Sequence, residues 1–116
     1  MKNIIVITGG AGFVGSNLIK LFLEKTEYKI ISIDNYSTGS KKNHIKDKRL
    51  NYVIGDTKNI FNILKKYKKQ IKTIFHFGEF ARIYQSFLNM SECIDSNTIG
   101  TNAVFNFCLQ NKIKLI

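Results

Sequence analysis

The sequence contains no proline, no tryptophan, only two cysteines and no long apolar run. Acidic residues are scarce as well: 8 Asp and Glu stand against 18 Lys and Arg, which gives the 116 residues a formal net charge of +10. A membrane-spanning helix needs about 20 apolar residues. The apolar stretch near the N-terminus is far shorter and runs straight into a glycine-rich turn. The sequence therefore predicts neither a membrane span nor a secretion signal.

The two cysteines fit no metal-binding spacing. Cys93 and Cys108 fall on one predicted helix, where a rise of about 1.5 Å per residue would hold them about 22 Å apart, too far for a disulfide. We therefore expect reduced thiols in a cytoplasmic protein, and no metal site.

The excess of lysine has two interpretations. A basic surface attracts nucleic acid or another polyanion. The lysines, however, scatter over predicted loops and helix faces and do not alternate with exposed aromatic residues. The pattern favours a solvated lysine-rich surface without a nucleic-acid partner.

Hydrophobic residues make up 44% of the chain, as in a globular protein, and strand and helix patterns alternate along it. Strands are predicted at Ile4–Thr8, Lys29–Asp34, Leu50–Gly55 and Thr73–Phe77, with a fifth starting at Lys112–Ile116. Helices are predicted at Phe13–Lys25, Asn59–Lys69 and Ser91–Gln110. This alternation predicts an α/β fold, a doubly wound parallel sheet with strand order 3-2-1-4 followed by strand 5.

The first helix shows apolar residues at the spacing of one helical face, namely Val14, Leu18, Leu21 and Phe22. We expect this face to pack on the sheet. Because a doubly wound nucleotide-binding sheet normally has a second half, we also expect residues 1–116 to be the first, incomplete part of a larger nucleotide-binding domain.

A glycine-rich turn, Thr8–Gly15, follows the first strand directly and leads into the first helix. In such a turn Gly9 permits the tight bend, Gly12 lets the backbone approach a phosphate, and Gly15 lets the helix pack against the strand. The helix then directs free N–H groups and the positive end of its dipole at the anion. The motif predicts a site for a dinucleotide pyrophosphate. A nucleoside-triphosphatase loop would continue with Lys and then Ser or Thr, which this chain lacks there.

Asp34 ends the second strand, about 20 residues beyond the turn, where an acidic residue binds the adenosine ribose. A carboxylate there repels a 2′-phosphate, so NAD is favoured over NADP. Lys41 and Lys42 would meet such a phosphate only if their loop folded back. The alternative is that Asp34 serves as a turn or helix-cap residue.

Other polar residues follow the third and fourth strands. Asp56 either accepts from the adenine amino group or caps the next helix. His76 is interpreted as a hydrogen-bonded core histidine rather than a base. Gly78 would let a cofactor approach the backbone at the switch point of the sheet. Glu79 faces either substrate or solvent, and Arg82 either a phosphate or the surface.

Several stretches together resemble the extended short-chain dehydrogenase/reductases, and among them the nucleotide-sugar epimerases and dehydratases, UDP-glucose 4-epimerases most of all. They are Thr8–Gly15, Asp34–Gly39, Gly55-Asp56, His76-Phe77 and the pattern Asn97-x-x-Gly100-Thr101-x-Asn102. The resemblance implies a Rossmann-type fold, NAD as cofactor, a nucleotide-sugar substrate and a homodimer for the full-length protein.

The resemblance also implies roles for individual residues. The turn holds the pyrophosphate, Asp34 and its loop hold the adenosine ribose, Asp56 and Thr57 contact adenine, and Phe77 to Glu79 lead toward the nicotinamide. The implied cofactor contacts are Gly9, Gly12, Phe13, Val14, Gly15, Asp34, Asn35, Ser37, Thr38, Gly39, Asp56, Thr57, Phe77, Gly78, Glu79 and Asn97.

The chain departs from the family in two respects. Ala81 stands where UDP-glucose 4-epimerases often carry Lys, and Glu79 where the family usually has a small residue. The family's catalytic Tyr-x-x-x-Lys pair is also missing, because none of the five tyrosines has Lys four positions later. We therefore assign no catalytic residue. A sugar 4,6-dehydratase, a UDP-glucuronate decarboxylase and a non-catalytic dinucleotide-binding module remain alternatives to an epimerase.

Overall fold

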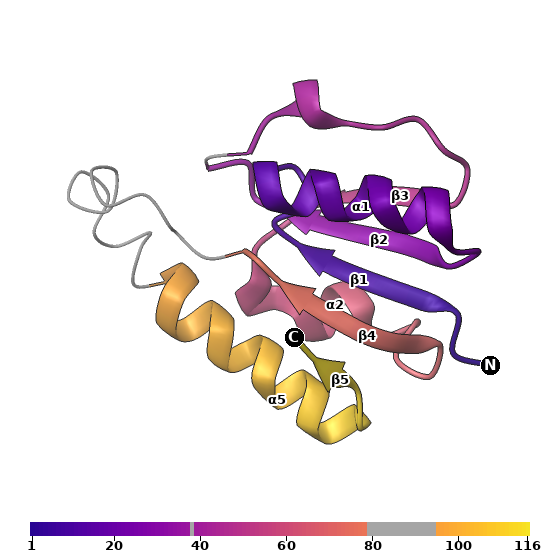
Figure 1. Ribbon diagram of the computed structural model, residues 1–116. Helices are drawn as coiled ribbons and strands as arrows, with labels where there is room; N and C mark the ends of the chain where they lie inside the picture. Colours follow the sequence, from indigo (N-terminus) through magenta and orange to yellow (C-terminus); the bar gives the residue numbers. More distant parts are fainter. Residues whose placement is uncertain (38, 79–94) are drawn as a thin grey trace.

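The computed structural model describes residues 1–37, 39–78 and 95–116. Five parallel strands form one sheet in the order β3-β2-β1-β4-β5 (Figure 1), which confirms the predicted topology. The strands are β1 (Ile4–Thr8), β2 (Lys29–Asp34), β3 (Leu50–Ile54), β4 (Ile71–His76) and β5 (Lys114–Leu115). The strand boundaries expected from the sequence are correct for β1 and β2 and differ by one or two residues at the ends of the others.

Helices cover both faces of the sheet. Helix α1 (Phe13–Lys25) lies on one face, and α2 (Ile60–Leu64) and α5 (Thr101–Asn111) lie on the other (Figure 1). A 3-10 turn, Thr57–Asn59, precedes α2, and a π-helical segment, Asp95–Gly100, precedes α5. None of the helices in the described ranges is long and apolar enough to cross a membrane.

The expected helix Asn59–Lys69 is shorter in the structure. Regular α-helix ends at Leu64, and the chain continues in turns in which Tyr67 N–H donates to the Leu64 carbonyl and Gln70 N–H to the Tyr67 carbonyl. Residues 65, 66, 68 and 69 are all lysine, and like charges three and four positions apart destabilise a helix. The expected helix Ser91–Gln110 is described only from residue 95, and its regular part is α5.

The buried face of α1 differs in part from the predicted one. Leu18 and Phe22 pack against the buried residues under the helix, as predicted. Gly15 and Ile19 are buried, whereas the side chains of Val14 and Leu21 are 56% and 51% exposed. The reason is the close approach at Gly15, where an added Cβ would lie 2.2 Å from the Gly9 carbonyl oxygen. A helix that touches the sheet at residue 15 must turn the face around residue 19 inward.

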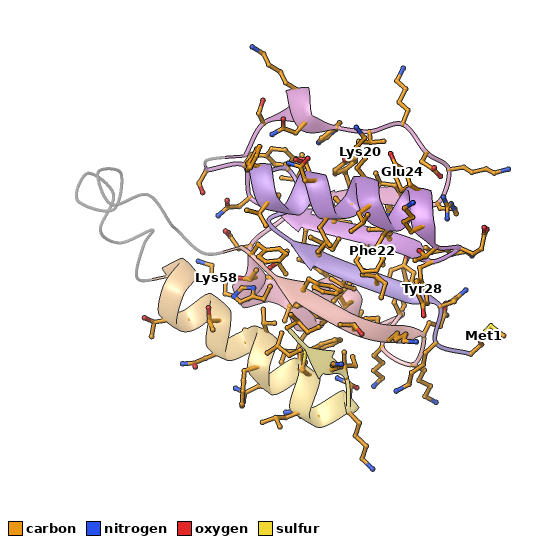
Figure 2. The ribbon with its side chains drawn as sticks, in the orientation of Figure 1. Met1, Lys20, Phe22, Glu24, Tyr28 and Lys58 are labelled. Carbon is orange, nitrogen blue, oxygen red and sulfur yellow. The ribbon has the colours of Figure 1, made fainter. Side chains whose placement is uncertain are left out.

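Phe22 shows the same orientation further along α1. It points down toward the sheet, while Lys20 and Glu24 point away into solvent (Figure 2). Its ring lies 5.3 Å from the ring of Phe75 and 6.5 Å from that of Tyr28, measured between centroids. These contacts close the layer between α1 and the sheet.

The sheet is apolar on both sides because both sides are covered. All five residues of β1 are buried, and the first four, Ile4 to Ile7, alternate between two core clusters. The layer under α1 contains Ile5, Ile7, Ile19 and Ile30. The layer under α2 and α5 contains Ile4, Val6, Ile31, Ile33, Ile60, Leu64, Ile71, Ile74, Val104, Phe107, Cys108 and Ile113. Strands buried on both faces read as continuous apolar runs, which is how β1 was recognisable.

Arg49 fixes the C-terminal end of α1. Its guanidinium donates to the carbonyl oxygens of Leu23 and Thr26, at 2.7 and 2.6 Å, and lies 3.5 Å from the Asp47 carboxylate. The last carbonyls of a helix lack partners within the helix, and a cation there also complements the helix dipole. Arg49 therefore ties the loop before β3 to the end of α1.

Replacing Arg49 tests this contact. Arg49→Lys keeps the charge but loses the planar fork that reaches two carbonyls, so we expect the free energy of unfolding to fall by about 1 kcal/mol. Urea denaturation would measure it, with Lys48→Ala, a change at the exposed neighbouring position, as control. Equal free energies of unfolding for the two variants would contradict a stabilising contact between Arg49 and the end of α1.

Cys108 supplies a second test of the core. It is buried among the apolar residues of α5, and desolvation raises the pKa of its thiol to about 11. Since the thiolate is the reactive form, we expect Cys108 to resist alkylation up to about pH 9 in the native protein and to react in denaturant. Peptide mapping after iodoacetamide treatment would follow this cysteine separately from Cys93, and equal rates in both conditions would contradict its burial.

Candidate functional site

The glycine-rich turn between β1 and α1 requires glycine at position 9 for its backbone conformation and at position 15 for lack of space. Gly9 has a φ of 75°, and an added Cβ would lie 2.7 Å from the Phe77 carbonyl oxygen. Its N–H donates to the Ile33 carbonyl, and its own carbonyl accepts from the N–H of Gly12. Gly15 touches that same carbonyl. The turn is therefore packed tightly between the ends of β2 and β4.

Gly12 is different, because an added Cβ would meet only the Gly9 carbonyl oxygen, at 3.3 Å. It is also the N-cap of α1 and has no side chain with which to cap the helix. Phe13 and Val14 follow with exposed side chains. The first N–H groups of a helix have no acceptor within it, and no acidic residue occupies the first turn of α1. This end of α1 is suited to an anion.

Asp34, at the end of β2, stands beside the turn. One carboxylate oxygen accepts the N–H of Ala11 at 3.0 Å, and the other accepts the N–H of Tyr36 at 2.8 Å. Tyr36 has a positive φ of 62°, and partial burial together with the charge of Asp34 raises the pKa of its phenol. Asp34 thus has the turn role that the sequence left open, while its side chain also lines the cleft described below.

Asn35 links the ends of β2 and β3. Its amide donates to a carboxylate oxygen of Asp56 at 2.7 Å, and its own oxygen accepts the N–H of Ser37 at 3.0 Å. Asp56 occupies the N-cap position of the 3-10 turn, but its side chain makes no capping hydrogen bond. The Asp56 side chain therefore does not cap the helical turn that follows it, which was one of the two roles predicted for it.

The end of β4 carries a hydrogen-bonded histidine, as expected. His76 Nδ1 lies 2.6 Å from the buried Thr8 hydroxyl, and Nε2 lies 2.9 Å from the hydroxyl of Thr101 on α5. The Thr8 hydroxyl also accepts the N–H of Gly78 at 2.9 Å. Both ring nitrogens are engaged in packing β4 between β1 and α5, which confirms the structural interpretation of His76.

These elements surround one cleft at the carboxyl ends of β1, β2, β3 and β4, where the chain leaves β1 and β4 toward opposite faces of the sheet. Its lining residues are Gly9, Gly12, Ile33, Asp34, Asn35, Ser37, Gly55, Thr57, Phe77 and Gly78. Ligands bind at this switch point in open α/β sheets. Within the described ranges, no group of three His, Cys, Asp or Glu side chains is arranged to hold a metal ion.

Eight of the sixteen residues predicted for the site line this cleft. Gly39 packs on Asp34 and Ala11, since an added Cβ would lie 2.8 Å from the Asp34 carboxylate. Thr38 and Glu79, like Arg82, lie outside the described residues. The backbone of Asn97 belongs to the π-helical segment before α5.

Comparison with known proteins gives the chain a family. The model of the NAD dependent epimerase/dehydratase family matches residues 5–116. The chain belongs to this family.

Solved structures share the fold. A UDP-N-acetylglucosamine 4-epimerase from Methanobrevibacter ruminantium, in complex with UDP-N-acetylmuramic acid, superposes with a TM-score of 0.82 at 27% identity, covering 99% of this chain and 37% of that one. The Bordetella bronchiseptica enzyme WbmG in complex with NAD gives 0.82 at 25% identity, covering 97% and 36%. A UDP-glucose 4-epimerase from Thermotoga maritima, with UDP-glucose, gives 0.82 at 22% identity, covering 95% and 35%. The chain thus spans about a third of the length of these proteins.

Sequence reasoning missed part of the site in this member of the family. Ile33 lines the cleft beside the predicted residues, and so does Gly55, which belongs to a stretch that resembles the family but was not predicted as a cofactor contact. Asn43 lies outside the cleft, yet its side chain donates to the Ala11 carbonyl at 2.8 Å. Ile33 follows from the strand pattern, because it precedes Asp34 at the end of β2. Nothing in the sequence indicates that the loop carrying Asn43 returns to the turn.

The glycines of the turn allow a matched test. Gly15→Ala places a Cβ 2.2 Å from a backbone oxygen, so we expect a loss of about 3 kcal/mol in the free energy of unfolding, or failure to fold. Gly12→Ala makes one close contact, at 3.3 Å, and has a φ of −85° that alanine adopts, so we expect a change of less than about 1 kcal/mol. Thermal unfolding of both variants would check the order, and equal losses would contradict the packing of the turn.

Proposed function

We propose that this chain is the NAD-binding part of a nucleotide-sugar epimerase. The observation that carries the proposal is the cleft, in which the carboxylate of Asp34 stands beside the uncapped N-terminal end of α1. A dinucleotide needs both features, a hydroxyl acceptor for its ribose and N–H donors for its pyrophosphate. The NAD-complexed structure that resembles this chain supports the choice of cofactor.

We propose one direction for the cofactor in the cleft. We assign the pyrophosphate to the turn from Gly9 to Gly15, including the N–H groups of Phe13 and Val14. The adenosine ribose lies at Asp34, with Asn35 and the stretch Ser37 to Gly39 beside it.

The strand order supports the assignment of the two ends of the dinucleotide. We assign adenine to the end of β3, at Asp56 and Thr57, because β3 lies beyond β2 on the side away from β4. The nicotinamide half then lies toward β4, along Phe77, Gly78 and Glu79, and extends toward Asn97 at the start of the last helical stretch.

The pyrophosphate assignment explains why position 12 is glycine. Within the protein, a Cβ at Gly12 makes only a close contact of 3.3 Å, so protein packing alone requires glycine there less strictly than at Gly15. A phosphate lying against the turn would need the same space. The turn therefore uses Gly9 and Gly15 for its own shape and Gly12 for its ligand.

The reaction that we propose is a transient oxidation of the sugar at C4, for which bound NAD supplies the hydride acceptor. In this chain, the residues of the cleft bind and orient the dinucleotide. We assign it no catalytic residue, because none of its tyrosines carries Lys four positions later. We propose that the Tyr-x-x-x-Lys pair and the sugar site belong to a part of the protein outside this chain. A 4,6-dehydratase or a decarboxylase would use the same NAD-binding part, and the sugar product distinguishes these enzymes from an epimerase.

The test is cofactor binding by the protein in its full natural length, freed of bound nucleotide. We expect calorimetry to show saturable binding that prefers NAD to NADP. Asp34→Asn should weaken NAD binding about tenfold or more, because a charged hydrogen-bond acceptor is lost. It should also reduce the ratio of the affinity for NAD to that for NADP.

Glu24→Gln is the matched control, since it removes the same charge from the exposed face of α1 (Figure 2). A folded protein that binds neither dinucleotide would overturn the proposal. A preference for NADP would overturn the role of Asp34. Incubation of the loaded protein with UDP-glucose, followed by analysis of the sugar, would then distinguish 4-epimerisation from loss of water or carbon dioxide.

A further inference from the structure

The loop after β2 returns to the glycine-rich turn and holds a single residue of it, Ala11, which is fully buried. The N–H of Ala11 donates to Asp34, and its carbonyl accepts both the backbone N–H of Ser40, at 3.1 Å, and the side-chain amide of Asn43, at 2.8 Å. Buried peptide groups must be paired. Here β2 and its loop supply every one of these partners, from 23 and 32 residues along the chain for the two side-chain bonds.

These contacts fix the peptide unit that joins Ala11 to Gly12 at both ends. Its carbonyl is held by Ser40 and Asn43, and its N–H donates to the Gly9 carbonyl at 3.1 Å. A peptide unit is planar. The direction of the following N–H group, that of Phe13, therefore depends only on rotation at Gly12.

The loop lies directly on the turn at this point. An added Cβ at Gly39 would approach the Ala11 side chain to 3.1 Å and the Asp34 carboxylate to 2.8 Å. A side chain at Gly39 would push the loop away from Ala11. The close approach places Asn43 within reach of the carbonyl, although Asn43 itself is an exposed residue that does not line the cleft.

We propose that Asn43 is a positioning residue for the pyrophosphate-binding turn. Its amide fixes the Ala11–Gly12 peptide unit and so orients the first N–H groups of α1 toward the anion. The proposal rests on the dinucleotide function proposed above. Of the two donors to the Ala11 carbonyl, Ser40 uses its backbone, so Asn43 is the one that substitution can remove.

A positioning role differs from a general contribution to stability in what it predicts for ligands. Adenosine occupies the ribose and adenine positions without touching the turn, whereas ADP adds a diphosphate that needs the oriented N–H groups. Loss of positioning lowers the affinity for ADP more than that for adenosine. A loss of stability alone changes the unfolding temperature and leaves the ratio of the two affinities unchanged.

The experiment compares Asn43→Ala with Asn62→Ala, which removes an exposed amide from α2. Both are made in the full-length, nucleotide-free protein, and dissociation constants for ADP and adenosine are measured by ligand-observed NMR. We expect the ADP-to-adenosine affinity ratio to fall about three- to tenfold in Asn43→Ala, the size of one lost hydrogen bond. Asn62→Ala should leave the ratio unchanged. Asn43→Gln, which keeps an amide donor, replaces Asn43→Ala if that variant does not fold, and should then retain more than half of the wild-type ratio.

The outcomes separate the two proposals. An unchanged ratio in folded Asn43→Ala, while the wild type binds ADP and NAD, overturns the role of Asn43 and leaves the function intact. An equal loss of affinity for both ligands also overturns it. A folded wild type that binds neither ADP nor NAD overturns the dinucleotide function and this inference together.

Discussion

The close contact between the start of α1 and the end of β1 governs much of this structure. The Gly9 carbonyl accepts the N–H of Gly12 and lies where a side chain on Gly15 would have to go. That contact sets how near α1 comes to the sheet, which face of α1 is buried, and where its free N–H groups are directed. A helix held at a greater distance would expose Ile19 and lose the packing of Phe22 against Phe75. The geometry of the cleft and the stability of the core layer under α1 thus depend on the same contact.

The parallel sheet is the second feature that determines the geometry of the cleft. Because all the strands run the same way, the residues that follow them meet at one edge although they are far apart in the sequence. Asp34 at the end of β2, Thr57 after β3 and Gly78 after β4 reach a single cleft in this way. The hydrogen bonds from Asn35 to Asp56 and from Gly78 to Thr8 then tie neighbouring strand ends to one another. The site is built from connections between strand ends rather than from any single loop.

The sequence predicted those parts of the fold that depend on short-range pattern. The buried run of β1, the glycines of the turn and the acidic end of β2 were all recognisable, because each is a local requirement of a parallel sheet with a glycine-rich turn. The buried face of α1 was predicted correctly at Leu18 and Phe22 and incorrectly at Val14 and Leu21, which fit the helical spacing as well as Ile19 does. Only the position of the sheet relative to Gly15 decides between these faces, and that is a tertiary contact.

The loop after β2 shows a different limit. Its residues have the composition of a polar turn, and nothing in their order distinguishes Asn43 from any other exposed asparagine. Its contact with Ala11 exists because Gly39 lets the loop lie flat on the turn, and this requires the structures of both segments. Long-range hydrogen bonds from polar loops of this kind leave no periodic signal in a sequence. Their partners are found only once the backbone is placed.

Asp34 takes part both in the glycine-rich turn and in the cleft at the strand ends, and its substitutions therefore affect both. Each carboxylate oxygen accepts one backbone N–H, from Ala11 or from Tyr36. An ionised carboxylate has about four lone-pair sites, so both oxygens retain capacity for the hydroxyl groups of a ribose in the cleft. The same side chain therefore holds the turn and faces the ligand. Removing its carboxylate disturbs the pyrophosphate end and the ribose end together. Exchanging one oxygen for an amide removes the charge and keeps the shape of the side chain, but it also places an NH2 group against one of the two backbone N–H groups. The unfolding temperature of Asp34→Asn therefore measures its effect on the turn, and the ratio of its affinities for NAD and NADP measures its effect on the choice of dinucleotide.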